Sequence, residues 1–574
     1  MPATTGEASA TSLFARHRDL LGRAVEACRT RRNWTAYPDD PAAHPAGEEG
    51  RAAAEQWFGG QLGRPFDLDQ PGPVVVQDDE VSPYTGEPLG ISYPRSDVDA
   101  LVAAALAAWP AWRRASHEER VGVCLEACDR LYRHNLELAY AAMHTTGQSF
   151  PMSYAGSGTN AIDRGIEAVA QAHLAHERVA PSATWSRDFG STTVRLDKRY
   201  RLVPLGLAVV IACASFPAWN AYPAVLANLV TGNPVVLKPH PSSVLQMALA
   251  VRILRETLAD AGFDPALVSL SVDSAAEPVA KRLVQHEATR IVDFTGSAAF
   301  GSWIEQNARS ARVYTETSGA NFVVLESVDD LAPVLRAVAG SLCLFTAQMC
   351  TSPQNVYVPR DGLPTSDGVV PAEEVAARLA EAVRAISGTP RRAAAVMGAV
   401  QAQSTLELLA RVRDEVAARG TVLLEPAAYE HPEHPAARTS GPLLGLVGLA
   451  EHDLFAQEQF GPVGFVVVAD DAVQAIERAT RDAREVGAIT GFVYSTDEQF
   501  VELAEELSAD AGVALSVNLT GPMPLNFSAA YSDYHVTGLN PAGTATLSDE
   551  SFIAGRFRVV QSRRPHVGAG EEDA

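Results

Sequence analysis

The chain has 574 residues, of which 47% are hydrophobic and 20% are charged. This ordinary globular balance excludes disorder throughout and a collagen-like repeat. At roughly 100–200 residues per domain, the length predicts about three or four domains. Acidic residues outnumber basic ones by 69 to 46, which gives a net charge of −23. Such a field repels phosphate backbones and anionic lipids, so we expect neither nucleic acid nor a membrane as a partner.

The six cysteines are too few for a disulfide scaffold, and no two of them have CxxC spacing. No metal-binding spacing such as HExxH occurs, so no metal site is expected. The first residues lack the apolar stretch of a signal peptide. The longest apolar run, 202–214, falls short of the ~20 residues of a membrane helix. These features predict a cytoplasmic protein in a reducing compartment.

Residues 1–74 are predicted to form a largely helical N-terminal extension, with a helix near 13–28. Apolar residues recur at helical spacing over 97–138, and Pro110 is expected to break that run. Around 188–205, apolar and charged residues alternate, which predicts a bridging β-hairpin.

From residue 203 onwards, short apolar runs alternate with helical patterns. The expected strands are 205–214, 234–238, 267–272, 291–294 and 313–316, and then 322–326, 355–359 and 464–469. The expected helices are 223–230, 243–261, 276–286, 298–309, 329–345 and 371–387. This alternation is typical of βαβ units with a parallel sheet, the scaffold of many nucleotide sites. We therefore predict an α/β fold with domains at 75–315 and 316–515, a C-terminal segment at 516–565 and a disordered tail at 566–574.

Several familiar sequence motifs of nucleotide-binding proteins and hydrolases are absent or occur in the wrong context. The pattern from Gly156 to Ala161 fits GxGxxG/A, but it follows a helical stretch instead of a strand, so we interpret it as a chance match. Neither a P-loop nor a GxSxG elbow is present.

Candidate functional residues stand where predicted βα units end. Thr295, Gly296 and Ser297 open a helix whose free N–H groups suit a pyrophosphate, although an ordinary capped turn explains them equally well. Cys350 precedes Pro353 in a connecting loop, where the usual reading is a buried inert thiol. Glu316 alone would be a solvated carboxylate, and Lys238 alone a charge at the rim of a site.

Taken together, these segments resemble the aldehyde dehydrogenase superfamily. FTGS is similar to its cofactor loop, ETSGAN to its general-base motif, AQMC to its nucleophile motif and EQFGPV to its second cofactor motif. The motifs occur in the family's order, and Glu316 and Cys350 stand 34 residues apart, the family's usual interval. The N-terminal extension and the segments SFPAWNAYP and KPHP look like the phenylacetic acid degradation enzymes of the PaaN type.

The resemblance implies two Rossmann-like α/β domains, an NAD(P)-binding one at 75–315 and a catalytic one at 316–515, plus a β-ribbon for oligomerisation. It implies that Cys350 attacks an aldehyde and that Glu316 activates the water that hydrolyses the resulting thioester. Cofactor contacts are implied for seven positions: Lys238, Pro241, Thr295, Gly296, Ser297, Glu458 and Phe460.

The sequence departs from the family at two site positions. The family's oxyanion-binding Asn is replaced by Ser215, so Ser215 or the nearby Asn220 is expected to donate, with the Cys350 N–H as the second donor. Pro241 stands where NAD-specific members carry Glu, so NADP should be accepted, and it is slightly favoured over NAD.

The C-terminal segment also differs from the family. Tyr531, Tyr534 and His535 are interpreted either as lining a substrate entrance or as plain loop packing. Residues 544–561 are expected to supply a strand that pairs between subunits of a homodimer or homotetramer.

Three functions remain open from the sequence. The first is NAD(P)-dependent oxidation of an aldehyde to an acid, the substrate being a semialdehyde from phenylacetyl-CoA ring cleavage, either free or CoA-linked. The second is a CoA-acylating aldehyde dehydrogenase, against which Glu316 argues. The third is a catalytically silent relative, which the changes at Ser215 and Pro241 keep open.

Overall fold

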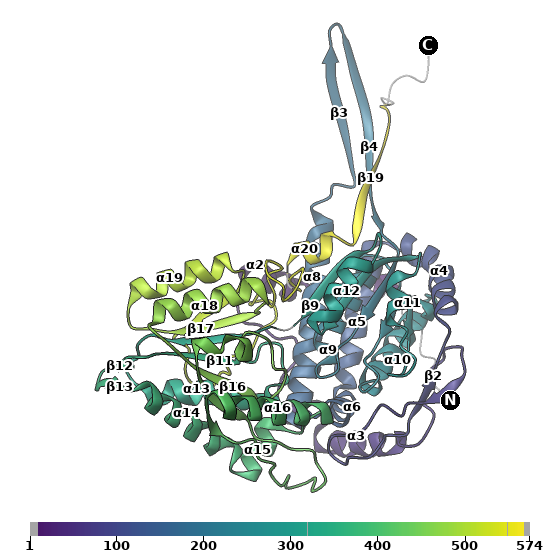
Figure 1. The fold of residues 1–574 in the computed structure, drawn as a ribbon. Helices are drawn as coiled ribbons and strands as arrows, with labels where there is room; N and C mark the ends of the chain where they lie inside the picture. Colours follow the sequence, from purple (N-terminus) through teal and green to yellow (C-terminus); the bar gives the residue numbers. More distant parts are fainter. Residues whose placement is uncertain (1–9, 318, 548, 567–574) are drawn as a thin grey trace, which may run out of the picture.

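The computed structural model describes residues 10–317, 319–547 and 549–566. Two α/β lobes lie side by side, and a long β-ribbon projects from one of them (Figure 1). One lobe is built on a five-stranded sheet and the other on a seven-stranded sheet. This arrangement confirms the predicted α/β class with two parallel-sheet domains. No helix among the described residues combines the length and the apolar character that crossing a bilayer requires.

The described chain begins with a largely helical region. Its helices are α1 (Ala10–Arg16), α2 (Arg18–Thr30), α3 (Gly47–Gln61), α4 (Val98–Arg114), α5 (His117–Arg133), α6 (Asn135–Thr146), α7 (Phe150–Tyr154) and α8 (Ala161–Glu177). A short antiparallel pair, β1 (Val74–Val76) with β2 (Ser92–Pro94), interrupts them. Helix α5 begins at a capping box in which Ser116 and Glu119 satisfy each other's backbone N–H groups. A π-helical turn, η2 (Ala155–Asn160), joins α7 to α8.

Pro110 does not break the helical run, so that prediction was wrong. The residue lies inside α4, two positions before the fully buried Trp112. Trp112 donates its indole N–H to the carbonyl of Leu229 at 2.9 Å. An internal proline costs a helix about 3 kcal/mol, and the tertiary packing of the last turn outweighs that cost.

The first sheet is parallel throughout, with the strand order β7-β6-β5-β8-β9. Its strands are β5 (Leu207–Ile211), β6 (Val235–Lys238), β7 (Val268–Leu270), β8 (Thr289–Gly296) and β9 (Arg312–Thr317). The connecting helices are α9 (Pro217–Val230), α10 (Leu245–Asp260), α11 (Ala280–Gln285) and α12 (Ala298–Asn307). The strand order reverses between β5 and β8, and ligands bind α/β sheets at the carboxyl edge of such a point.

The second sheet has the order β14-β15-β16-β11-β10-β17-β18, with β14 alone antiparallel to its neighbour. Its strands are β10 (Phe322–Leu325), β11 (Asn355–Pro359), β14 (Thr421–Leu424), β15 (Leu443–Gly448), β16 (Val463–Ala469), β17 (Thr490–Tyr494) and β18 (Ala514–Val517). The accompanying helices are α13 (Leu331–Cys343), α14 (Ala372–Ser387), α15 (Pro390–Met397), α16 (Gln403–Arg419), α17 (His452–Phe455), α18 (Ala472–Glu485) and α19 (Glu498–Asp510). A small hairpin pairs β12 (Leu363–Thr365) with β13 (Gly368–Val370).

The projecting ribbon (Figure 1) has three antiparallel strands in the order β19-β4-β3. They are β3 (Ser182–Phe189), β4 (Thr192–Pro204) and β19 (Phe557–Pro565), which follows the short helix α20 (Glu550–Ala554). The predicted hairpin is present and begins earlier than expected. The predicted terminal strand is also present, but here it pairs with β4 of the same chain. Phe189, Val559 and Val560 are exposed on the ribbon.

The structure bears on the predicted domain boundary at residues 315 and 316 and on the predicted C-terminal tail. The boundary between residues 315 and 316 cuts β9, because that strand runs on to Thr317. Glu316 therefore belongs to the edge strand of the first sheet and not to the second domain. The predicted disordered tail lies, from residue 567 onwards, outside the described residues.

Candidate active site

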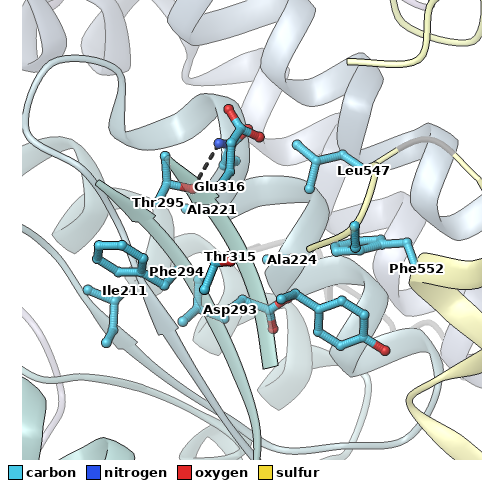
Figure 2. A pocket seen from close by; sticks show the side chains of 14 residues that line it. Ile211, Ala221, Ala224, Asp293, Phe294, Thr295, Thr315, Glu316, Leu547 and Phe552 are labelled. Carbon is cyan, nitrogen blue, oxygen red and sulfur yellow. Dashed lines mark hydrogen bonds between the residues drawn. The ribbon is translucent and has the colours of Figure 1, made fainter. Parts of the chain in front are cut away.

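The carboxyl edge of the first sheet carries Thr295 and Glu316 on neighbouring strands. The parallel register of β8 and β9 pairs these two residues, and Figure 2 shows their side chains in one pocket. Asn220, in the first turns of α9, donates its amide N–H to Thr295 Oγ1 at 2.8 Å, the dashed line in Figure 2. Three of the predicted site residues are thus brought together from two strands and a helix.

The pocket in Figure 2 includes a cavity of about 20 Å³, lined by Asn220, Thr295 and Glu316 among others. A cavity of this size holds about one water molecule. Glu316 Oε2 and Asn220 Oδ1 are buried and have no hydrogen-bond partner among the described residues. Buried polar atoms without partners are costly, and in native proteins they often mark a site for a water or a ligand.

Cys350 lies in the loop between α13 and β11, as predicted from the helix before it and Pro353 after it. Phe345, Thr346 and Ala347 precede it in left-handed backbone conformations, with φ of 49°, 53° and 47°. Such conformations are strained for residues other than glycine and persist only where the surroundings enforce them. The packing around these three residues therefore fixes the backbone conformation of the segment that leads to Cys350.

Asn321, five residues after Glu316, fastens this loop. Its amide nitrogen donates to the carbonyl of Cys350 at 2.7 Å and to that of Ser352 at 3.0 Å. Its amide oxygen accepts from the backbone N–H groups of Ile489 and Thr490. The motif that supplies Glu316 therefore also fixes the main chain at Cys350.

His535 joins the thiol to the carboxylate. Its Nε2 lies 3.0 Å from Glu316 Oε1 and 3.7 Å from Cys350 Sγ. Trp219, on α9, points its indole N–H at the same nitrogen, at 3.2 Å. Among the described residues this is the one place where three side chains of the His, Cys, Asp and Glu types bring their polar atoms within 4.8 Å of one another.

The C-terminal segment brings His535 to this place. After the histidine the chain returns along β9, where Gly543 bridges Glu316 and Ala542 accepts from the N–H of Thr317. A Cβ at Gly543 would stand 2.7 Å from the carbonyl oxygen of Thr315, so this close approach requires glycine. His535 itself is buried, at 3% exposure.

The surroundings shift the pKa values of the two reactive groups in opposite directions. Burial, and then the charge of Glu316, raise the pKa of the Cys350 thiol well above its usual value. Burial alone would also raise the pKa of Glu316, but the interaction with His535 and the hydrogen bonds with His535, Asn220 and Cys350 together outweigh burial and lower that pKa. The carboxylate is therefore ionised, whereas the thiol needs a nearby group to take its proton.

A larger cavity, of about 390 Å³, opens onto Cys350 and His535. Its walls are mainly apolar, formed by Met152, Phe216, Trp219, Leu344, Val396 and Phe527 among others. None of the described residues that line it is a lysine or an arginine. Gly156, whose motif was interpreted as a chance match, lies in this wall on the η2 turn.

The remaining wall is polar and includes Asp39, from the N-terminal extension, and Asn526. Thr159 donates its hydroxyl to Asp39 at 2.6 Å, and burial raises the pKa of this carboxyl group. The N-terminal extension, whose role the sequence left open, thus contributes directly to the cavity beside Cys350.

Five of the predicted cofactor residues lie at the carboxyl edge of the first sheet, and Glu458 and Phe460 lie in the second lobe. Ser297 caps α12, and the first turn of this ten-residue helix is exposed, which fits an anionic pyrophosphate. Lys238 ends β6 and pairs with the buried Asp273 at 2.8 Å. Pro241 accepts a hydrogen bond from Gln77 through its carbonyl. These groups fit a dinucleotide, and Glu458 and Phe460 are half-exposed in the loop before β16.

Neither candidate oxyanion donor is among the described residues that line the large cavity, whereas Asn220 lines the small cavity together with Glu316. Ser215 is buried, and its carbonyl accepts from Gln148 at 3.0 Å, while the Asn220 amide N–H is engaged by Thr295. Trp219 and Asn526, which the sequence did not single out, do line it.

Comparison with known proteins agrees with this geometry. The model of the aldehyde dehydrogenase family matches residues 77–521. The crystal structure of an NAD-dependent aldehyde dehydrogenase from Burkholderia multivorans superposes with a TM-score of 0.94 at 43% identity, covering 97% of this chain and 99% of that one. Vanillin dehydrogenase from Pseudomonas sp. is 29% identical over 77% of this chain and 85% of its own length. Malonate-semialdehyde dehydrogenase 1 from Geobacillus kaustophilus is 24% identical over 83% of this chain and 93% of its own length.

The matched residues cover both sheets and include Cys350, Glu316 and the predicted cofactor positions. The chain belongs to the aldehyde dehydrogenase family and is an NAD(P)-dependent aldehyde dehydrogenase.

Proposed function

We propose that the chain oxidises an apolar aldehyde to the carboxylic acid, with Cys350 as nucleophile and Glu316 as the base for hydrolysis. The observation that carries this proposal is that Cys350 and Glu316 lie close together: both side chains contact His535 Nε2, although they come from different lobes. Forming a covalent thioester splits one difficult oxidation into two easier steps.

The bound cofactor would supply the hydride acceptor. Cys350 binds the aldehyde carbon, and Trp219 and Phe216 form part of the apolar cavity wall that receives the rest of the aldehyde. We assign Lys238 to ribose or phosphate, Thr295, Gly296 and Ser297 to the pyrophosphate, and Glu458 with Phe460 to the nicotinamide ribose. We also assign an oxyanion donor role to Ser215 or Asn220 together with the Cys350 N–H, as the family pattern implies.

Hydrolysis is supported by the free oxygen of Glu316. Its Oε1 is held by His535, whereas Oε2 is buried and has no hydrogen-bond partner in the part of the chain that the structure describes; it lies beside a cavity of about 20 Å³ that suits one water. Such an arrangement favours water over coenzyme A as the acyl acceptor, and so argues against the CoA-acylating alternative.

The larger cavity indicates the class of aldehyde. Its apolar wall lacks lysine and arginine among the described residues, and Asp39 adds negative character. A substrate carboxylate would be repelled and poorly solvated there, so we propose an uncharged, apolar body next to the aldehyde. The dehydrogenation of vanillin by a relative of 29% identity is consistent with an aromatic body. A specific candidate is the CoA-linked semialdehyde from phenylacetyl-CoA ring cleavage, with only its acyl part in the cavity.

Cofactor choice depends on the end of β6. Pro241 removes the carboxylate that would repel a 2′-phosphate, so we propose that NADP is accepted at least as well as NAD. We further propose a cytoplasmic homodimer or homotetramer. Exposed Phe189, Val559 and Val560 on the ribbon support assembly, and the six cysteines, all free, support a reducing setting.

The experiment is a kinetic screen of the purified chain with NAD and with NADP. The aldehydes are benzaldehyde, hexanal, malonate semialdehyde and a CoA-linked aldehyde, and the product is identified as free acid or as acyl-CoA. We expect the highest kcat/KM with the uncharged apolar aldehydes and free acid as product, and we expect Cys350→Ala to be inactive. Preference for malonate semialdehyde would contradict the substrate class, and activity of Cys350→Ala would contradict the mechanism.

A further inference from the structure

His535 is a buried imidazole that the aldehyde dehydrogenase reaction as described above does not use. It reaches the site from an irregular C-terminal loop and contacts both reactive groups through a single nitrogen, Nε2. The other ring nitrogen, Nδ1, is buried and has no hydrogen-bond partner among the described residues. Leaving a buried polar atom unpaired costs about 1–3 kcal/mol, so the position of this ring needs an explanation.

The contacts of Nε2 restrict its protonation. Trp219 can donate to Nε2 only when that nitrogen carries a lone pair, whereas Glu316 Oε1 at 3.0 Å needs a proton between the two atoms. The first state is the neutral ring protonated at Nδ1. In the second state Nε2 carries the proton, either in the neutral tautomer or in the imidazolium. The contacts of Nε2 therefore accommodate this nitrogen both with and without a proton, as they must for a group that takes up and returns a proton at this atom.

We propose that His535 is the proton acceptor of Cys350 in this enzyme. This deepens the proposed function, because it rests on Cys350 being the nucleophile. The Cys350 S–H bond breaks, its proton binds His535 Nε2, and the imidazolium is held by Glu316 Oε1. The freed sulfur electron pair forms the S–C bond to the aldehyde while the carbonyl electron pair moves to oxygen.

The same proton returns in the second half of the reaction. After the hydride has left the substrate, the thioester remains on Cys350. Water attacks the thioester carbon and gives one proton to Glu316 Oε2. As the C–S bond breaks, the leaving sulfur takes its proton back from His535. The released acid carries the water oxygen, and Glu316 passes its proton to solvent, so the enzyme is restored.

The charged and titratable groups around this centre come from several elements. Glu316 lies on β9, Cys213 follows β5, and Glu458 precedes β16; all three disfavour a thiolate at Cys350. Arg164, on α8, lies 5.5 Å from the Trp219 ring centre and donates to the carbonyl of Asp533, two residues before His535. Both Glu316 and His535 contact the sulfur, and His535 is the one of the two that becomes cationic when it accepts a proton. A thiolate–imidazolium pair stabilises the reactive form.

The test is the pH dependence of Cys350 alkylation by iodoacetamide, followed by peptide mass spectrometry with a chelator present throughout. Alkylation reports the thiolate and requires neither aldehyde nor cofactor. In the wild type we expect reaction near neutral pH, despite the buried thiol. In His535→Gln, which keeps a donor for Glu316 but cannot take up a proton, we expect the rate at pH 7 to fall at least about tenfold and the profile to move to higher pH.

Two further variants keep the test decisive if His535→Gln folds poorly. Trp219→Phe removes the N–H that competes for Nε2, so the profile should move to lower pH, the opposite direction. His117→Gln alters a histidine stacked on His173 and His176 and should keep the wild-type profile. A His535→Gln profile that superposes on the wild type, or a Trp219→Phe shift to higher pH, would overturn the proposal. Dehydrogenase activity in Cys350→Ala would instead overturn the proposed function.

Discussion

Asn321 holds the main chain of Cys350 through a hydrogen bond of 2.7 Å from its amide nitrogen to the Cys350 carbonyl. The same side chain accepts from the backbone at Ile489 and Thr490, so it ties the nucleophile loop to β17. Asn321 follows Glu316 by five residues, and the distance between thiol and carboxylate therefore depends on this one amide.

Replacing Asn321 by Ala should impair both catalysis and folding. The change leaves two carbonyls and two N–H groups without their partner, and each group that stays unpaired should cost about 1–3 kcal/mol of unfolding free energy. Loss of the Cys350 position should lower kcat at least about a hundredfold, because catalysis is sensitive to misplacement of about 1 Å. Denaturant unfolding measures the loss of unfolding free energy, and steady-state kinetics measures the fall in kcat. Asn307→Ala, which removes a bond only within α12, is the matched control; equal kinetic effects in the two variants would contradict this role.

Gly156 tests whether the large cavity receives the aldehyde. A Cβ there would stand 2.7 Å from the Phe216 ring and 3.0 Å from the Met152 sulfur. Overpacking of this kind costs about 1–3 kcal/mol, so Gly156→Val should raise KM for the aldehyde about tenfold and leave KM for the cofactor unchanged. Gly340→Ala, where a Cβ meets nothing within 4 Å, is the control. An unchanged aldehyde KM in Gly156→Val would place the substrate elsewhere.

Pro241 tests the basis of cofactor choice. Glutamate at this position would put a negative charge next to the 2′-phosphate of NADP, and such a pair repels by about 1 kcal/mol or more. Pro241→Glu should therefore shift the ratio of kcat/KM values towards NAD by at least about fivefold. The two ratios come from initial rates with each cofactor at saturating aldehyde. A ratio that does not move would show that the 2′-phosphate lies away from residue 241.

Asp163 should make the fold sensitive to alkaline pH. It accepts from the N–H of Ala36 and from the hydroxyl of Tyr531, and so links the N-terminal extension to the loop that carries His535. Burial raises its pKa from 3.8 to about 8. A carboxyl group with a raised folded-state pKa stabilises the fold fully below about pH 4 and loses that contribution as the pH rises through 8.

The thermal midpoint of the wild type should therefore fall between pH 5 and pH 9 by at least about 2 °C more than that of Asp163→Asn. Asp129→Asn, on the neighbouring helix α5, should keep the wild-type slope. Parallel curves for the wild type and Asp163→Asn would show that Asp163 does not titrate in this range.

The sequence predicted the elements whose signal is local. Buried runs such as 207–211 and 355–359 are short, apolar and flanked by glycine or proline, so the strands and their parallel arrangement could be predicted. Cys350 and Glu316 could be singled out as candidates because each stands in a short motif, Glu316 at the end of a strand and Cys350 in the loop between a helix and a strand. The prediction at Pro110 was wrong because the rule that proline ends a helix considers only neighbouring residues. Here the packing of the buried Trp112 keeps the helix intact beyond Pro110.

The rest depends on contacts between distant residues. His535 and Glu316 are 219 residues apart, and the loop around His535 has no periodicity that would indicate where it packs. The pattern around Gly156 was compared only with a dinucleotide-binding motif. Its place in the cavity wall follows from the π-helical turn, which the sequence did not predict. Asp39 lies in the extension, where nothing in the sequence indicates that it reaches the site.

The central claim is that the Cys350 sulfur and the Glu316 carboxylate act in turn on one carbon. Its most direct test is intact-protein and peptide mass spectrometry of Glu316→Gln after mixing with benzaldehyde and cofactor. We expect a burst of reduced cofactor equal to the enzyme concentration and a stable acyl group on Cys350, because formation of the thioester needs only the sulfur and its hydrolysis needs the carboxylate. Wild-type turnover in this variant, or an acyl group found on another residue, would contradict the account.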